Sequence, residues 1–165
     1  MVVPLALVLA MPSPGEAQAS VLHPTELCRD HADASIVTFE AALLEARVRE
    51  SLRLDEQDDL TCDLVSDLTA LNVRPAGIES LAGIQNLSGL TALYVRGTSI
   101  TDISALSELT TLTELRLSSN PGFSNIEPLL DHREIDSVSL LDTRVSCANV
   151  ARLQSNGLFV FSACQ

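Results

Sequence analysis

The sequence predicts an α/β solenoid, a short right-handed superhelix of repeats with parallel strands on its concave face. Three observations indicate this fold class. Apolar residues recur with a period of 22 residues, and a fixed period of about 20 to 29 residues is typical of solenoids. Within each period a short stretch alternates apolar and polar residues, as a strand with one buried face does. Segments with helical spacing precede and follow the repeats, where a stack of strands needs its open edges covered.

The repeat is clearest in Leu90–Ile100, where apolar residues stand at the first, fourth, sixth and eleventh positions. Shifting this frame along the chain gives equivalent residues in three further copies. They are Leu68, Leu71, Val73, Ala76 and Ile78; Leu112, Leu115, Leu117 and Asn120; and Ile135, Val138, Leu140, Thr143 and Val145. The repeats are therefore expected at 65–86, 87–108, 109–131 and 132–152. One extra residue in Pro121–Phe123 shifts the last copy, and a terminal half-copy is expected in which Phe159, Phe161 and Cys164 take the strand positions.

These copies resemble leucine-rich repeats, and their spacing, with segments such as Gly97–Leu106, is similar to that of bacterial internalins. Residues 60–84 also resemble the junction between helical cap and first repeat in that family. The resemblance implies recognition of other proteins on the concave strand face. The family has an asparagine that bonds the turn backbone, whereas the equivalent positions here are Ala76, Thr98, Asn120 and Thr143. A less continuous polar ladder is therefore expected.

Both flanks of the repeats predict caps. Upstream, Ile36–Leu54 carries apolar residues at helical spacing, which predicts a helical cap within 20–64. These apolar residues are Phe39, Leu43, Leu44, Val48 and Leu52. Downstream, Ser146–Leu153 predicts a short helix with Ser146 as its N-cap and Gly157 beyond its end. A last strand at Leu158–Phe161 follows, and the C-terminal cap is expected at 153–165.

The first 19 residues predict an export signal. An apolar run at Val2–Met11 precedes Ala17-Gln18-Ala19, which has the form of a signal-peptidase site and would leave Ser20 as the first residue. The run is too short to cross a hydrocarbon layer of about 30 Å, so no transmembrane anchor is expected. The protein is expected to be periplasmic, cell-surface or secreted. The alternative is an apolar N-terminus in a cytosolic protein.

Four cysteines allow three pairings. Cys28 and Cys62 lie at the N-terminal cap, and Cys147 and Cys164 lie at the C-terminal cap. If the repeats stack as predicted, the two groups are roughly 15 to 20 Å apart at ordinary strand spacing, too far for a disulfide. The expected pairs are therefore Cys28–Cys62 and Cys147–Cys164, which suit an oxidising compartment. Four buried free thiols in a reducing cytosol are the alternative.

Composition limits the function. The chain has 165 residues, 46% of them apolar, which is enough for one domain with a core. Its formal net charge of −12 argues against binding nucleic acid. The three histidines lie at no metal-ligand spacing, so neither metal nor cofactor is expected. The acidic run Asp55–Asp59 with Asp63 is the one calcium candidate, and a solvated turn is the favoured interpretation. No catalytic motif is present, so no enzymatic activity is expected.

The register places a set of side chains on the concave face. These are Ala70, Asn72, Arg74, Ala92, Tyr94, Arg96, Glu114, Arg116, Ser118, Ser137, Ser139 and Leu141. Arg74 and Arg96 share a column, and Arg116 is expected beside Tyr94. The hypothesis is that Asn72, Arg74, Tyr94, Arg96, Glu114, Arg116 and Ser118 bind a carboxylate or acidic loop of a partner. The alternative is a solvated face on which Glu114 neutralises Arg116. Phe123 falls in an apolar column and is expected in the core.

The predicted function is therefore non-enzymatic recognition by an exported monomer. A protein partner is expected, and a glycan is less favoured. Two alternatives remain open: a structural or regulatory subunit of a cell-envelope complex, and a cytosolic leucine-rich repeat scaffold.

Overall fold

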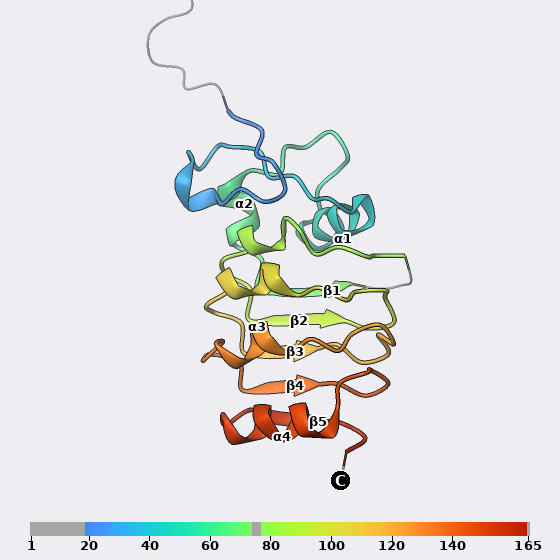
Figure 1. The fold of residues 1–165 in the computed structure, drawn as a ribbon. Helices are drawn as coiled ribbons and strands as arrows, with labels where there is room; N and C mark the ends of the chain where they lie inside the picture. Colours follow the sequence, from blue (N-terminus) through green and yellow to red (C-terminus); the bar gives the residue numbers. More distant parts are fainter. Residues whose placement is uncertain (1–18, 74–76, 165) are drawn as a thin grey trace, which may run out of the picture.

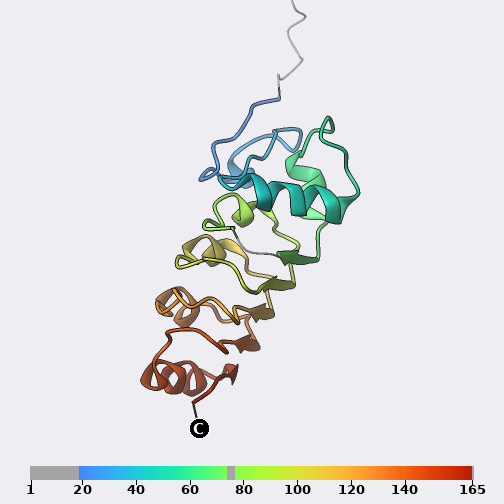
Figure 2. The same cartoon turned by 90° about the vertical axis from the view of Figure 1, so that its right-hand side faces the viewer.

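The strands of the protein are stacked one above another along a single axis, with helical segments on the opposite side of each coil (Figures 1 and 2). The computed structural model describes residues 19–73 and 77–164. The predicted export signal, except Ala19, and the predicted site residue Arg74 lie outside these ranges. No helix in the described residues is long and apolar enough to cross a membrane.

The five strands form one parallel sheet in the order β1-β2-β3-β4-β5, and this confirms the predicted stack. They are β1 (Ala70–Val73), β2 (Ala92–Val95), β3 (Glu114–Arg116), β4 (Ser137–Ser139) and β5 (Phe159–Phe161). Leu71 pairs with Leu93, Leu93 with Leu115, Leu115 with Val138, and Val138 with Val160. Partners are therefore 22 residues apart, except across β3 and β4, where the extra residue of the third repeat makes the step 23.

The core is a column of apolar side chains that runs the length of the stack. Leu71, Leu93, Leu115 and Val138 have no exposed surface. On the helical side, η2 (Ile84–Asn86), η3 (Ser104–Glu108) and α3 (Glu127–Leu130) contribute buried Ile84, Leu106 and Leu129. Each coil thus seals the apolar interior of the next, as expected of a repeat whose contacts are with its neighbours.

The extra residue of the third repeat does not expose an aromatic ring. Phe123 is fully buried, as predicted. Its amide donates to the carbonyl of Asn120 (3.0 Å), and its carbonyl accepts from the amide of Arg144 (2.8 Å). The insertion is therefore absorbed in the turn, while the core column continues through it.

The orientation predicted for the strand residues of the last half-copy is wrong. Phe159 and Phe161 are 63% and 53% exposed, and their register partners are Ser137 and Ser139 on the strand face. Successive strand residues point to opposite faces, and the core position passes from Val138 to Val160. The two rings therefore lie on the solvent side of the last strand. Cys164, the third residue predicted at a strand position, lies beyond the end of β5.

The N-terminal cap is helical, but its main helix is shorter than predicted. α1 spans Ala42–Leu52 rather than Ile36–Leu54. Ile36 forms bridges with Val21 and Thr61, so the chain is extended there. Phe39 is still buried, although it lies outside the helix, whereas Leu43 is 52% exposed. η1 (Cys28–Asp30) and α2 (Cys62–Ser66) complete the cap, and α1 packs against β1 at the end of the stack (Figure 2).

The C-terminal helix matches its prediction. α4 spans Cys147–Ser155, and the Ser146 hydroxyl accepts a hydrogen bond from the amide of Asn149 at 3.2 Å. Gly157, just past the helix, has φ +94, in the left-handed region that glycine adopts without strain. The chain then turns directly into β5.

Both predicted disulfides are present. Cys28 is bonded to Cys62, with 5.5 Å between their Cα atoms, and Cys147 is bonded to Cys164, with 5.4 Å. One bond therefore ties η1 to α2 in the N-terminal cap, and the other ties the start of α4 to the segment after β5.

Asn120 is the polar anchor of the turns. Its side chain has no exposed surface. Its Nδ2 donates to the carbonyls of Val95 (2.7 Å) and Leu117 (2.8 Å), and its Oδ1 accepts from the amide (3.2 Å) and hydroxyl (2.6 Å) of Thr98. Thr143 reproduces one of these bonds, from its hydroxyl to the carbonyl of Leu140 at 2.8 Å. The polar ladder is thus concentrated at one residue that links two repeats.

We expect Asn120→Ala to lower the free energy of unfolding by about 3 kcal/mol, because it leaves several buried polar groups of two repeats unpaired. Urea unfolding of the oxidised protein measures this. The matched control is Asn72→Ala, the same substitution on the exposed strand face, which should change stability by less than about 0.5 kcal/mol. Equal effects of the two substitutions would contradict the anchoring role.

Replacing Cys147 and Cys164 together by serine should lower the unfolding free energy by about 3 kcal/mol, because the unfolded chain regains the freedom of the closed loop. The Cys28/Cys62 pair closes a longer loop and should cost slightly more. Thermal unfolding with and without reductant measures both.

Thiol titration of protein from its native host should find no free thiol, and finding four would support the reducing-cytosol alternative.

Candidate functional site

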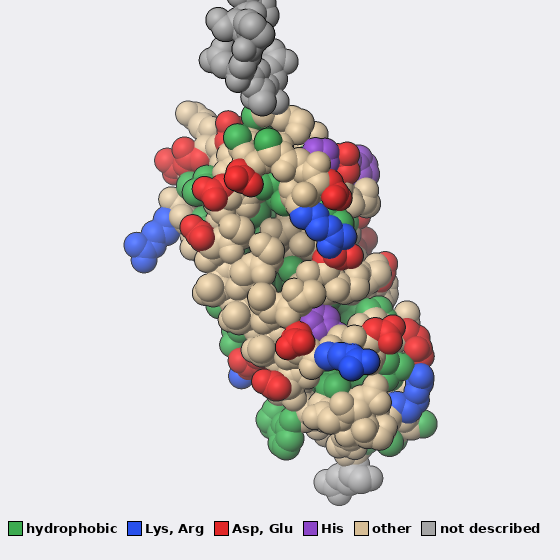
Figure 3. All heavy atoms as spheres, turned by 90° about the vertical axis from the view of Figure 1, so that its left-hand side faces the viewer, with side chains coloured by type: hydrophobic (Ala, Val, Ile, Leu, Met, Phe, Trp, Pro, Cys, Tyr) green, Lys and Arg blue, Asp and Glu red, His purple; other side chains and the backbone are tan. Residues whose placement is uncertain are grey.

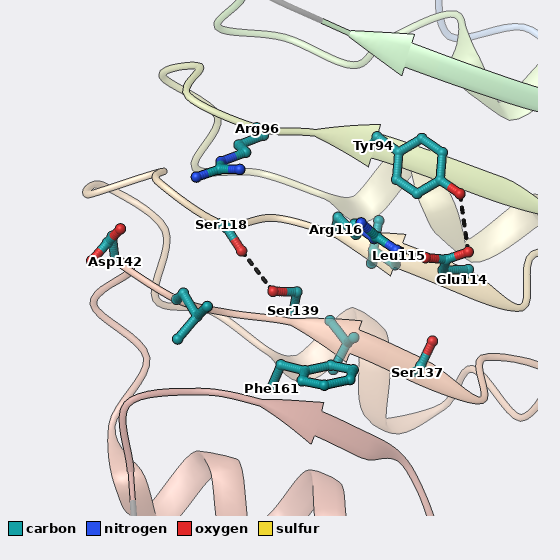
Figure 4. Close-up of a pocket in the computed structure, with 12 residues that line it drawn as sticks. Tyr94, Arg96, Glu114, Leu115, Arg116, Ser118, Ser137, Ser139, Asp142 and Phe161 are labelled. Atoms are coloured by element: carbon teal, nitrogen blue, oxygen red, sulfur yellow. Dashed lines mark hydrogen bonds and ion pairs between the residues drawn. The ribbon is translucent and has the colours of Figure 1, made fainter.

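The strand face carries a hollow of about 360 Å³ that extends across the exposed sides of β2 to β5 (Figure 4). Its lining comes from the strands and from the turn after β4. The lining residues are Tyr94, Arg96, Glu114, Leu115, Arg116, Ser118, Ser137, Val138, Ser139, Leu141, Asp142 and Phe161. Five of the seven predicted binding residues therefore line one hollow. Asn72, on β1, is exposed but does not line it.

Tyr94, Glu114 and Arg116 form a closed cluster at one end of the hollow. The Tyr94 hydroxyl donates to Glu114 Oε2 at 3.0 Å, and Arg116 donates to Glu114 Oε1 through Nε (2.8 Å) and Nη2 (2.6 Å). The Arg116 guanidinium carbon also lies 4.9 Å from the centre of the Tyr94 ring. The predicted proximity of Tyr94 and Arg116 is confirmed, and the ion pair of the alternative interpretation is present as well. Glu114 thus occupies the Arg116 donors that the hypothesis assigned to a partner's carboxylate.

The same cluster changes the acidity of the phenol. The hydrogen bond to Glu114 is the main cause that raises the pKa of Tyr94 above its ordinary value, and burial and the negative charge of Glu114 act in the same direction. The positive charge of Arg116 opposes them. The neutral phenol is therefore the favoured form, which keeps Tyr94 a hydrogen-bond donor to Glu114.

Arg96 is differently placed. Its side chain is exposed, and it forms no ion pair with any residue in 19–73 or 77–164. Figure 4 shows it across the hollow from Phe161, with Ser118 and Ser139 between them. The Ser118 and Ser139 hydroxyls are hydrogen-bonded to each other at 2.6 Å. Arg96 is thus the cation of this hollow whose donors are open to a ligand.

Two apolar residues line the hollow that the predicted binding set does not contain. Leu141, which is 44% exposed, was placed on the concave face but not among the binding residues, and Phe161 was missed. Phe159 packs edge-to-face against Phe161, with 4.8 Å between ring centres and 74° between ring planes. Figure 3 shows hydrophobic side chains gathered at the surface near the C-terminal end of the molecule. The signal was available, since adding one period to Ser137 and Ser139 gives Phe159 and Phe161.

Asp142 was also missed. It lines the hollow in the turn after β4, with φ 55, and accepts a long hydrogen bond (3.4 Å) from the Ser119 hydroxyl. Nothing in the repeat pattern marks this position, because turn residues follow no apolar period. Figure 4 shows its carboxylate at the same edge of the hollow as Arg96.

The acidic segment after α1 is held by an arginine. Arg49 Nη1 donates to the backbone carbonyls of Asp55 (3.0 Å) and Asp58 (2.6 Å). Carbonyl oxygens of this kind are what calcium binds, and here a guanidinium already takes them. Among the described residues, no group of three histidine, cysteine or acidic side chains is arranged to hold a metal ion.

The 22-residue register, the parallel sheet and the asparagine-anchored turn define the class of fold: it is a solenoid of the leucine-rich repeat kind. No protein-family model matches the chain, and no curated protein matches it. Solved structures similar to it include two from Listeria monocytogenes str. 4b F2365. Internalin C2 is 18% identical, over 73% of this chain and 73% of that one, with a TM-score of 0.42. Internalin inlF is 22% identical, over 73% of this chain and 50% of that one, with a TM-score of 0.42.

A third similar structure holds the CBM51-2 and INT domains of Clostridium perfringens ZmpB, solved with GlcNAc. It is 25% identical over 49% of this chain, with a TM-score of 0.45. This chain spans 17% of that chain's length.

The cluster makes a prediction for the pKa of Tyr94, which can be titrated alone because the chain has one tyrosine and no tryptophan. Glu114→Gln should lower this pKa toward its ordinary value, since the charged acceptor is lost. Arg116→Gln should raise it, since a positive charge that favours tyrosinate is lost. Ultraviolet absorbance of tyrosinate against pH measures both, and Glu127→Gln, remote from the hollow, is the control.

The sign of the coupled stability effect follows. A raised folded-state pKa means that the Tyr94 interaction stabilises the fold below the ordinary tyrosine pKa and that this contribution is lost as the pH rises through the folded value. Shifts of the same sign in Glu114→Gln and Arg116→Gln would contradict this account of the cluster.

Proposed function

We propose that this chain is an exported, non-enzymatic recognition module that binds a protein partner, as a monomer, through the hollow on its strand face. The observation that carries the proposal is the combination, around one hollow, of solvent-exposed apolar side chains and an arginine that forms no ion pair with any residue in 19–73 or 77–164. Arg96 lies just after β2, whereas Leu141 lies just after β4 and Phe161 is the last residue of β5. Aromatic and arginine side chains together are typical of the residues that contribute most to protein interfaces.

The exposed aromatic pair supports a binding role. Phe159 and Phe161 keep more than half of their surface exposed although 34 apolar residues of the described chain are buried. Exposed apolar side chains grouped beside polar ones are typical of interaction surfaces. The closed Tyr94–Glu114–Arg116 cluster supports the same role in another way, since side chains fixed by their own bonds lose little freedom when a partner binds.

Export is the second part of the proposal. Two disulfides suit an oxidising compartment. Cleavage after Ala19 would preserve the contacts of Ser20, whose carbonyl accepts from Ile36 (2.7 Å) and whose hydroxyl bonds that of Ser35 (2.9 Å). We propose a signal peptide at 1–19, a helical cap at 20–64, repeats at 65–152 and a C-terminal cap at 153–165. The resulting location is periplasmic, cell-surface or secreted.

The chemistry of the hollow supports binding rather than catalysis. Its two acids are Glu114, which is held by Arg116, and Asp142, which is exposed in the turn. No histidine or cysteine is among the lining residues. General acid–base and nucleophilic catalysis need a proton acceptor within hydrogen-bond reach of the reacting group, and the hollow offers an arrangement better suited to holding a ligand.

The test is affinity capture from the native surroundings of the protein. We expect Arg96→Glu to reduce partner recovery at least tenfold, because it puts a negative charge where the partner's carboxylate would sit. Arg133→Glu is the matched control: it makes the same charge change at an exposed arginine that does not line the hollow. Equal recovery with wild type and Arg96→Glu would refute binding at this surface while leaving the fold untouched.

A further inference from the structure

We propose that the hollow binds an extended protein segment in which a carboxylate side chain and a bulky apolar side chain are two residues apart, on the same face of the segment. Arg96 takes the carboxylate, and Leu141 with Phe161 takes the apolar side chain. This inference rests on the proposed function and adds the chemistry of the partner. It follows from three features of the hollow: where its free charge lies, where its apolar surface lies, and how far apart the two are.

The free positive charge lies at Arg96 alone among the lining residues. Arg116 is bonded twice to Glu114 and stacked on Tyr94, so an incoming acid would have to displace an existing carboxylate. Arg96 has no ion-pair partner in the described residues, and its planar fork suits a carboxylate. Asp142, in the turn after β4, also lines the hollow, and its negative charge repels an acid from that turn. Both charges therefore direct a partner's carboxylate toward β2.

The apolar surface lies at the β4–β5 end. Leu141 and Phe161 line the hollow, and Phe159 buttresses the Phe161 ring from the side. An aliphatic or aromatic side chain placed here would remove exposed apolar area on both molecules from water, which is favourable by roughly 25 cal/mol for each Å² buried. A purely acidic segment would leave this wall uncovered, and a purely apolar one would leave Arg96 without a partner.

The separation of the two sites matches an extended backbone. The ladder continues beyond the strands, since the amide of Gly97 donates to the carbonyl of Ser118 (3.1 Å) and that of Ser119 to Leu141 (2.7 Å). Arg96, Ser118 and Leu141 thus follow one another on adjacent coils, and two coil spacings come to roughly 10 Å. An extended chain covers about 3.3 Å per residue and points every second side chain to the same face. A step of two residues therefore covers about 7 Å, which spans this gap once the length of the arginine side chain is included.

The floor between the two sites suits a peptide backbone. Ser118 and Ser139 hydroxyls face each other there, as Figure 4 shows. Each hydroxyl can both donate and accept, so the pair can meet the alternating N–H and C=O groups of an extended segment. The chain's net charge of −12 repels a polyanion, so a segment with an isolated acid, rather than a run of acids, is the form that this surface accepts.

The experiment is an NMR titration of the ¹⁵N-labelled, oxidised full chain with two synthetic peptides. The probes are Ac-Gly-Glu-Ser-Phe-Gly-NH₂ and the same peptide with Gln in place of Glu. We expect amide shifts at Arg96, Ser118, Leu141 and Phe161. The Glu peptide should bind roughly two- to fivefold more tightly, which is the range of an exposed ion pair.

Two variants separate the contributions. Arg96→Gln should abolish the preference for the Glu peptide, whereas Phe161→Ser should weaken both peptides and keep their ratio. Arg133→Gln, at an exposed arginine outside the hollow, should change nothing. Retention of the preference in Arg96→Gln, equal affinity of the two peptides for wild type, or shifts outside the hollow would each overturn the proposal. So would sedimentation showing a wild-type dimer that Phe161→Ser dissociates, since a second copy would then cover the apolar wall.

Failure of this inference is distinguishable from failure of the proposed function. If Arg96→Glu abolishes partner capture but the peptides show no preference, the hollow is a binding site of different chemistry. If capture is also unchanged, the strand face is not the binding surface.

Discussion

The structure depends on one constraint: each coil can bury its apolar stripe only against its neighbours. The inward positions of successive strands, such as Leu93 and Leu115, stay in register because a shift of one residue would turn each of them toward water. That requirement fixes which side chains face outward as well. The arrangement of side chains on the strand face therefore follows from the packing of the core: the register that pairs Leu93 with Leu115 also places Tyr94 beside Arg116.

The same constraint explains the caps. A coil at either end of the stack has one neighbour instead of two, so its open side needs other support. At the N-terminus, α1 packs against β1 and a disulfide joins η1 to α2. At the C-terminus, α4 and the Cys147–Cys164 bond support β5 from the helical side. The strand side of β5 keeps two exposed phenylalanines, and it is this incompletely covered end that supplies the apolar part of the candidate site.

Within the site, the internal ion pair matters as much as the free charge. Glu114 is bonded to both Arg116 and Tyr94, so these three side chains are fixed as one cluster at one end of the hollow. Exposed ion pairs contribute little to stability. The Glu114–Arg116 pair matters because it fixes the positions of the side chains in the cluster. Of the two arginines that line the hollow, it leaves Arg96 as the one that a partner's carboxylate can reach.

The sequence alone determined the repeats, the strand positions, the disulfide pairing and the burial of Phe123, because all of these follow from a fixed period and from the need to bury apolar residues. It also placed Tyr94 beside Arg116. The sequence-based predictions were wrong for two segments, one in the N-terminal cap and one in the last strand. The segment around Ile36 is extended and not helical, because Ile36 forms bridges with Val21 and Thr61. Phe159 and Phe161 face solvent because Val160 occupies the core position of the last strand. Which of the arginines that line the hollow has an ion-pair partner among the described residues was decided by the tertiary structure, since an ion pair depends on side-chain distances that no period encodes.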